Sequence, residues 1–418
     1  MRRAIISVLV VTSGLLLNSC NTTDPPEGQG IGLKLENVSC TEAWITLTTT
    51  NLQLPTTVTL EQNDQVHSII NLVKTDTLIY IDSLLPNRTY QYQALNNQYR
   101  VSSNELSVTT LDTTSQNFTF EIFEFGDGFS SSYFNDVWIF NPDDIWVCGN
   151  VFTNDSTDGN LYHWNGSYWK AHRLNFVDME GIWGMDTIMY LASGGLWLYD
   201  RDTLIRQNIQ GNFEPGQAVH KLWGSSRSNI YGVGPWGTIV YYNGVRWTKI
   251  DFDTQWYFYE ITGNKESGVG YAVARNANNN TIIIELTNSI TEIIYDSQEN
   301  PMGFGSWTIH FEDNQLLLSY GNIWSFNLIS NYVKELIKLP TGLGVLTINS
   351  CKGNDIYYYG DEGAEARLVH FNGVNYKIFN IPQIDPDNYG GIHAINDLAV
   401  SVGFTNNKAY LILIRRGS

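Results

Sequence analysis

The residues whose types and spacing could do chemistry lie in the segments between predicted strands. Trp236 and Trp256 fall in such segments, where an exposed aromatic face could stack on a sugar ring. Acidic and aromatic side chains in comparable segments would join them in one ligand-binding surface: Asp253, Asp361, Asp385 and Tyr389. We therefore take these six residues as the candidate binding site for a protein or a glycan.

Two oxygen-rich segments could bind a cation. Residues 154–158 supply Asp155 and Asp158, and residues 385–388 supply Asp385 and Asp387. Neither segment has the fixed glycine and terminal glutamate of a calcium loop, so calcium is a weak candidate and no other cofactor is indicated. The histidines show no paired zinc spacing, and no nucleophile elbow or phosphate loop occurs. The sequence therefore indicates no catalytic residue.

The net charge limits the partners. The 418 residues include 24 basic and 42 acidic side chains, which gives a formal charge of −18 at pH 7. A chain of this charge repels nucleic acid and anionic lipid headgroups. We expect no nucleic-acid partner, and the acidity is compatible with cationic partners or simply with the solubility of an exported protein.

The first twenty residues predict export. Arg2 and Arg3 precede an apolar run over residues 4–17, which is shorter than the roughly 20 residues needed to span a bilayer. A small residue stands directly before Cys20. The segment resembles the signal of bacterial lipoproteins, which implies removal of residues 1–19 and acylation of Cys20. An ordinary secretory signal with an incidental cysteine is the alternative.

The segment after the cysteine predicts how the chain is held. Residues 20–30 are polar and rich in proline and glycine, which is typical of a flexible tether. Asn21 does not match the aspartate that resembles an inner-membrane retention signal. We therefore expect the lipid anchor to make the membrane a partner and to place the chain at the outer membrane, on either leaflet, including the cell surface.

Residues 31–112 predict a β-sandwich, because they contain seven short runs of alternating apolar and polar residues. Leu84, Pro86 and Tyr90 resemble the corner that precedes the sixth strand of fibronectin type III domains. The usual core tryptophan is missing from its place in the second strand, and Trp44 stands a few positions early. The three later cysteines are odd in number and fall in different units, so we interpret them as small buried residues.

Residues 117–418 contain an internal repeat. A spacing of eleven residues recurs at Trp138 to Gly149, Trp183 to Gly194, Trp223 to Gly234, Asn349 to Gly360 and Ile392 to Gly403. Successive four-stranded units of this length predict the blades of a β-propeller. Seven blades fit the chain, and six blades with residues 304–339 as an insertion are the alternative. The pattern at residues 223–234 resembles propeller repeats of bacterial surface proteins, which implies a fold and no particular activity.

The repeat also predicts how the ring closes. The last unit holds three strands, and the alternating segment 118–125 can supply the fourth. Asn-Gly pairs at 165–166, 243–244 and 372–373 predict two-residue type I′ turns between the third and fourth strands. The recurring tryptophans 138, 183 and 223 are interpreted as packing between blades. The candidate binding residues would lie on the face formed by the other set of loops.

Three functions are compatible with this all-β chain. The sequence favours a non-enzymatic lipoprotein of the outer membrane or cell surface, whose propeller binds or scaffolds a protein or glycan. A carbohydrate-active enzyme is the alternative, and it requires inward carboxylates of raised proton affinity beside an aromatic cleft. A structural subunit of an envelope assembly is the third possibility.

Overall fold

A computed structural model gives the structure of this chain. It describes residues 28–417 except 129, 155–158, 175–177, 201–202, 253–254, 289, 300–305, 330–331, 364, 382–383 and 385–387. The signal segment and Cys20 lie outside the described residues. The described residues form strands β1 to β37, and none of their elements is a helix long and apolar enough to cross a membrane.

The chain divides into two compact units. The smaller comprises the described residues up to Lys34 with Thr46–Ile79 and Tyr90–Ser107. The larger comprises Leu35–Ile45, Tyr80–Thr89 and Val108–Ser418, and it contains the whole repeat region.

The strands before the repeat region form two sheets. One sheet has the order β1(Gly30–Val38), β2(Ala43–Thr50), β5(Asp76–Ile81). The other has the order β4(Gln65–Leu72), β3(Thr56–Gln62), β6(Thr89–Asn96), β7(Val101–Ser102), with β8(Leu106–Thr109) paired to β6. Buried and exposed residues alternate along β3, as expected for a strand with one face on a core. Trp44 is 5% exposed, so this displaced tryptophan is a core residue.

The described residues of the repeat region form seven further sheets, and each sheet is one blade. Blades 1 to 3 are β10(Tyr133–Asn141), β11(Asp144–Val151), β12(Gly159–Trp164), β13(Trp169–His172); β14(Gly181–Met185), β15(Ile188–Ser193), β16(Gly195–Asp200), β17(Thr203–Arg206); and β19(Lys221–Ser226), β20(Asn229–Gly234), β21(Thr238–Tyr242), β22(Trp247–Lys249), with β18(Ile209–Gln210) added parallel to β22. Blades 4 to 6 are β23(Tyr257–Gly263), β24(Gly270–Arg275), β25(Thr281–Thr287), β26(Ile290–Asp296); β27(Ile309–Glu312), β28(Gln315–Tyr320), β29(Asn322–Asn327), β30(Tyr332–Ile337); and β31(Leu343–Lys352), β32(Asp355–Glu362), β33(Glu365–Phe371), β34(Tyr376–Ile381). We refer to the first to fourth strands of a blade as its strands a to d.

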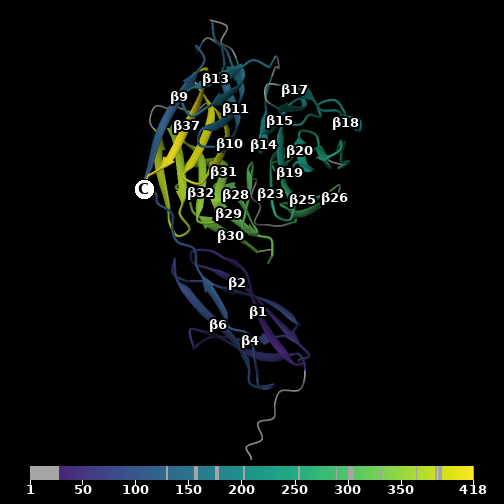
Figure 1. Cartoon of the computed structure of the whole chain (residues 1–418), viewed down its shortest axis with the longest axis vertical. Helices are drawn as coiled ribbons and strands as arrows, with labels where there is room; N and C mark the ends of the chain where they lie inside the picture. Colours follow the sequence, from purple (N-terminus) through teal and green to yellow (C-terminus); the bar gives the residue numbers. More distant parts are fainter. Residues whose placement is uncertain are drawn as a thin grey trace, which may run out of the picture. The chain divides into compact units, whose positions relative to one another are not determined.

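Blade 7 joins the two ends of the repeat region. It contains β35(Asn388–Ile395), β36(Leu398–Thr405) and β37(Lys408–Arg416), and β9(Phe118–Phe125) adds to β37 as the outermost strand. The innermost strands contact one another in the cyclic order β10, β14, β19, β23, β27, β31, β35 and back to β10. The region is therefore a closed β-propeller, and Figure 1 shows β9 beside β37.

Neighbouring blades share apolar cores. Phe134 of blade 1 packs in one cluster with Val402 and Leu411 of blade 7. Trp183 is 1% exposed and Trp223 is 8% exposed, and each belongs to a cluster that joins two blades. These tryptophans are packing residues, as the repeat indicated. Tyr376, which occupies a recurring aromatic position of strand d, is instead 40% exposed.

The Asn-Gly pairs do join strands c and d, but the predicted type I′ geometry is wrong. Trp164 pairs with Trp169, so the loop has four residues, and only Gly166 of its Asn-Gly pair has a positive φ, at 86°. The Asn165 side-chain oxygen accepts hydrogen bonds from the backbone N–H groups of Ser167 and Tyr168. An asparagine that caps its own loop in this way does not need a positive φ. The loops at Asn243 and Asn372 repeat this arrangement.

Candidate functional site

The register of strands a and b identifies seven equivalent positions on the innermost strands. In each blade, one residue of strand a pairs with the residue at the equivalent position of strand b. From blade 1 to blade 7 these strand-a residues are Trp138, Trp183, Trp223, Thr262, His310, Asn349 and His393. Blades 1 to 3 carry tryptophan at this position, and blades 4 to 7 carry polar residues. In blade 7 the eleven-residue spacing predicts Ile392 at this position, but His393 is the residue that pairs with Val400.

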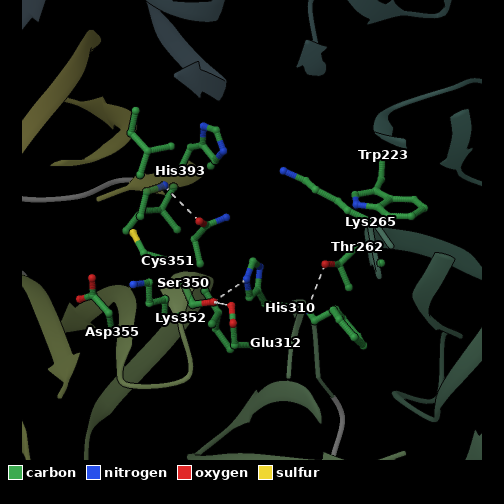
Figure 2. A pocket seen from close by; sticks show the side chains of 18 of the residues that line it. Trp223, Thr262, Lys265, His310, Glu312, Ser350, Cys351, Lys352, Asp355 and His393 are labelled. Atoms are coloured by element: carbon green, nitrogen blue, oxygen red, sulfur yellow. Dashed lines mark hydrogen bonds between the residues drawn. The ribbon is translucent and has the colours of Figure 1, made fainter. Parts of the chain in front are cut away.

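A cavity of about 970 Å³ lies among these positions. Its wall continues along strands a from Asp136 and Glu260 to the turns that join strands a and b, which contribute Lys265, Asp313 and Asn396. Because adjacent strands of a blade are antiparallel, these a–b turns lie at the opposite end of the blade from the b–c turns. We call this cavity the channel (Figure 2).

One end of the channel contains an ionic cluster. The ammonium of Lys221 lies 3.2 Å from Asp136 Oδ2 and 4.0 Å from Glu260 Oε2. Burial by itself lowers the pKa of Lys221, but the two carboxylates outweigh burial and raise it above its ordinary value. Burial raises the pKa of Glu260 to about 7, against the opposing effect of Lys221. The cluster therefore carries a buried cation whose charge is compensated by carboxylates from two other blades.

A second polar group lies nearer the a–b turns and contains a serine between a histidine and a carboxyl. The Ser350 hydroxyl donates to Glu312 Oε2, and His310 Nε2 lies 2.9 Å from Ser350 Oγ. Burial raises the pKa of Glu312 to about 7 and lowers the pKa of His310 to about 4, with Lys265 lowering the histidine further. Since a hydroxyl has a single proton, His310 Nε2 must donate when Ser350 donates to Glu312. Protonation of Glu312 would allow both bonds to reverse where His310 carries its proton on Nδ1.

His393 completes the polar side of the channel. Its ring stacks on Trp138 with centroids 4.3 Å apart, and its Nδ1 accepts a 2.8 Å hydrogen bond from the Ile139 N–H. Burial lowers the pKa of His393 to about 3, with Lys265 and His310 lowering it further. A neutral ring whose Nδ1 accepts must carry its proton on Nε2. His393 is therefore fixed as an Nε2–H donor.

The amide and hydroxyl groups of the channel wall are also oriented as donors. The Asn349 Oδ1 accepts from the Ala394 N–H at 3.0 Å, and the Thr262 Oγ1 accepts from the Phe311 N–H at 3.0 Å. Asn264 Oδ1 accepts from two backbone N–H groups of its own turn. Because backbone groups already bind these oxygens, the side chains are left with their N–H and O–H groups for a ligand.

Two lysines at the channel wall have no ion-pair partner among the described residues. These are Lys265 and Lys352, for which no described carboxylate lies within 4.0 Å of the ammonium. In Figure 2 the Lys265 side chain reaches into the open centre, toward His393 and His310. Its influence on the pKa values of both histidines is consistent with this position.

The predicted binding residues lie elsewhere. Trp236 is 51% exposed in the turn between β20 and β21, and the Gly237 N–H donates to the Trp256 carbonyl, so these two segments are adjacent. Asp361 is half-buried at the end of β32 and pairs with Ala366. Neither these three residues nor any other described member of the predicted set lines the channel.

The remaining predictions fall on residues that are not described. Asp253 and Asp385 lie outside the described residues, as do the calcium candidates Asp155, Asp158 and Asp387, and the side chain of Tyr389 is likewise not described. Among the described residues no group of three or more His, Cys, Asp or Glu side chains could hold a metal ion. Cys40 and Cys148 are buried free thiols, and Cys351 is only partly buried.

Sequence reasoning missed the polar residues of the channel. The signal that could have found them is the contrast within the repeat, because positions equivalent to the tryptophans of blades 1 to 3 carry Thr262, His310, Asn349 and His393. A polar residue at a packing position of a repeat indicates a wall that faces water or a ligand.

The comparisons with known proteins support the fold. No family model and no curated protein matches this chain. A structure described as YCF48 bound to D1 peptide matches with a TM-score of 0.53 and 12% identity, over 72% of this chain and 95% of that one. A streptogramin B lyase structure matches with a TM-score of 0.55 and 13% identity, over 71% of this chain and 97% of that one. At these identities the likeness shows that the chain is a β-propeller protein.

Proposed function

We propose that this chain is an exported, lipid-anchored binding protein whose propeller holds a glycan in its channel. The observation that carries the proposal is the set of oriented polar side chains on blades 4 to 7 that line one cavity. A cavity of about 970 Å³ is at the upper end of the range for small-ligand sites, which is roughly 300–1,000 Å³.

The composition of the channel wall favours a glycan over a folded protein. The side of blades 1 to 3 contributes aromatic and aliphatic groups, including Trp138, Phe140 and Leu222, and the opposite side contributes hydrogen-bonding groups. A sugar chain has both apolar C–H faces and hydroxyl groups, so it can use both sides. A peptide is the competing ligand, since a propeller of this fold is described in complex with one.

The surface around the exposed Trp236 of blade 3 is a second candidate site for glycan binding. Trp236 has a φ of 55°, a backbone conformation that a bulky side chain rarely adopts, and it remains 51% exposed. Gln217 donates to the Trp236 carbonyl and holds the turn. We propose this surface, with Trp256, as an additional contact for a longer glycan.

Catalysis on the bound glycan is the second candidate function. The observation that favours it is Glu312, an inward carboxyl whose pKa burial raises to about 7, hydrogen-bonded through Ser350 to His310. A group that titrates near neutral pH can act as a general acid or base. The proposed chemistry is hydrolysis: Glu312 donates its proton to the glycosidic oxygen as the bond to the anomeric carbon breaks, water adds to that carbon and releases a proton, and the Glu312 carboxylate is reprotonated. Turnover of a bound oligosaccharide would reveal it.

The anchor is proposed from the sequence alone. Acylation of Cys20 would hold the chain on the outer membrane through residues 21–30. Labelling of cells with an alkyne fatty acid should mark the wild-type chain and not the Cys20→Ser variant. A Cys40→Ser variant is the matched control, because Cys40 is a buried thiol. Equal labelling of both variants would contradict acylation at Cys20.

A glycan array tests the binding function. The full chain in detergent should bind a restricted set of oligosaccharides, and the nearly isosteric Asn349→Asp variant should lose them. The aspartate can still accept from the Ala394 N–H but replaces the free amide donor with an acceptor. Wild-type silence on the array, with capture of peptides instead, would replace the glycan proposal with a peptide ligand.

A further inference from the structure

The channel has a charge that contrasts with the rest of the chain. The chain carries a net charge of −18, yet Lys265 and Lys352 line the channel with no described carboxylate within 4.0 Å. Two other basic side chains near the channel are matched by acids. Lys221 contacts Asp136, and Arg416 contacts Asp355 and Asp397. Lys265 and Lys352 therefore place two ammonium groups without a described ion-pair partner at the channel wall.

The neutral groups around Lys265 reinforce this polarity. His393 presents an Nε2–H, because its Nδ1 accepts from the Ile139 N–H. Asn349 and Thr262 retain their donor groups, because their oxygens are bound by backbone N–H groups. One cation beside several neutral donors is an environment that suits an anionic acceptor.

From these contacts we infer that the glycan of the channel is acidic and that its carboxylate binds between the Lys265 ammonium and the Nε2–H of His393. The inference rests on the proposed function and names its ligand class. A carboxylate has two acceptor oxygens, so one can bind the ammonium and the other the imidazole N–H.

The charge of the site favours a monoanion. Lysine is a point charge, whereas bidentate recognition of phosphate is typically provided by arginine. Arg416 is the arginine that lines the channel among the described residues, and its guanidinium already contacts Asp355, Asp397 and the Tyr357 hydroxyl. Of the two channel lysines, Lys265 is the one that reaches toward His393, and a single negative charge matches it there.

The test compares acidic oligosaccharides with their neutral forms. Uronic-acid and sialic-acid oligosaccharides, each paired with its methyl ester, are titrated into the full chain in detergent, with neutral and sulfated oligosaccharides alongside. Esterification keeps the shape of the sugar and removes its charge. At least one acid should bind about tenfold to a hundredfold more tightly than its ester, which is the range for loss of a charge-assisted hydrogen bond.

Variants of Lys265 assign the effect to this site. Lys265→Met should reduce the affinity for the acid to that for the ester, and Lys265→Arg should retain most of it. Lys170→Met is the matched control, because Lys170 is exposed on the outer strand β13, and it should change neither affinity. Circular dichroism of each variant confirms that the propeller is folded.

The possible failures are distinguishable. Equal affinity for acid and ester, binding only of neutral or sulfated sugars, or an unchanged acid affinity in Lys265→Met would overturn the carboxylate assignment and leave the binding function standing. Absence of binding to every oligosaccharide would overturn the proposed function, and the carboxylate assignment with it.

Discussion

The Lys221 ammonium lies 3.2 Å from the Asp136 carboxylate across the end of the propeller channel, and it lies 4.0 Å from Glu260. Lys221 belongs to β19, Asp136 to β10 and Glu260 to β23. One cation therefore connects strands of blades 1, 3 and 4. The side chains of Lys221 and Asp136 are each less than one-fifth exposed, so this pair is more desolvated than an ion pair on the surface.

Removal of this cation should destabilise the propeller strongly. Lys221→Met leaves two inward carboxylates without their counter-charge, and we expect a loss of about 3–5 kcal/mol in the free energy of unfolding. Urea denaturation measures it. Arg227→Met is the control, because its pair with Asp186 is more than half exposed and should contribute at most about 1 kcal/mol. Similar losses of unfolding free energy in the two variants would show that the channel cluster contributes no more to stability than a surface ion pair.

Ring closure should depend on the side chains of β9. Phe125 makes edge contacts with Phe134, Tyr162 and Trp169, with ring centroids 5.2, 5.0 and 5.9 Å apart. Phe125→Ala should lower the free energy of unfolding by about 3 kcal/mol, because it leaves a void between blades 1 and 7. Tyr168→Ala, at a residue 60% exposed, should change it by less than about 0.5 kcal/mol. An unchanged melting temperature in Phe125→Ala would argue against β9 as the closing strand.

Glu312 should make stability depend on pH. The folded chain keeps its proton up to pH about 7, whereas the ordinary value of 4.5 applies to the unfolded chain. Folding thus takes up a proton between these values, so the free energy of unfolding falls as pH rises from 4.5 to about 7 and is level above that. Glu312→Gln should show a shallower fall over the same window in denaturant titrations. Parallel curves for variant and wild type would contradict the raised pKa.

The same carboxyl should make ligand affinity depend on pH. Glu312 lies near Asp313, Asp355 and Lys265, with Ser350 and, through it, His310 on its other side. Ionisation of Glu312 adds a negative charge beside the proposed carboxylate site, so affinity for an acidic glycan should fall as pH rises through about 7. Titration calorimetry at several pH values should show this slope in the wild type and a flatter one in Glu312→Gln. An affinity that rises with pH would exclude an anionic ligand.

The exposed Trp236 and the partly buried Trp256 separate the two candidate surfaces. If the channel is the main site, the double variant Trp236→Ala, Trp256→Ala should retain binding of a short glycan and weaken only a longer one. Surface plasmon resonance with oligosaccharides of increasing length measures this. Loss of the shortest ligand in the double variant, with full binding in Asn349→Asp, would show that the glycan binds at the surface around Trp236 and Trp256 and not in the channel.

The fold was predictable because the repeat is local in sequence. Every blade except blade 7 is formed from consecutive strands, so the recurrence of Trp138, Trp183 and Trp223 is visible along the chain. The predicted closing segment, residues 118–125, and the strand β9 have the same limits, because alternation of apolar and polar residues marks a strand wherever it pairs.

The channel was not predictable in the same way. Thr262 pairs with Tyr271 nine positions on, whereas His310 pairs with Leu317 seven positions on, so the a–b turns vary in length and a fixed spacing misplaces the inner residues. The contact of Glu312 with Ser350 joins two blades and depends on side-chain rotamers. Side-chain contacts between blades form only when the blades pack together, so no local sequence pattern predicts them.

Hydrogen–deuterium exchange can locate a bound glycan on the propeller directly. The full chain is labelled with and without its best oligosaccharide from the array. We expect slower exchange of the backbone amides at residues 262–268, 310–314 and 394–397, which line the channel or border it. Protection confined to residues 234–238 and 255–257, with no change at the a–b turns, would contradict glycan binding in the channel.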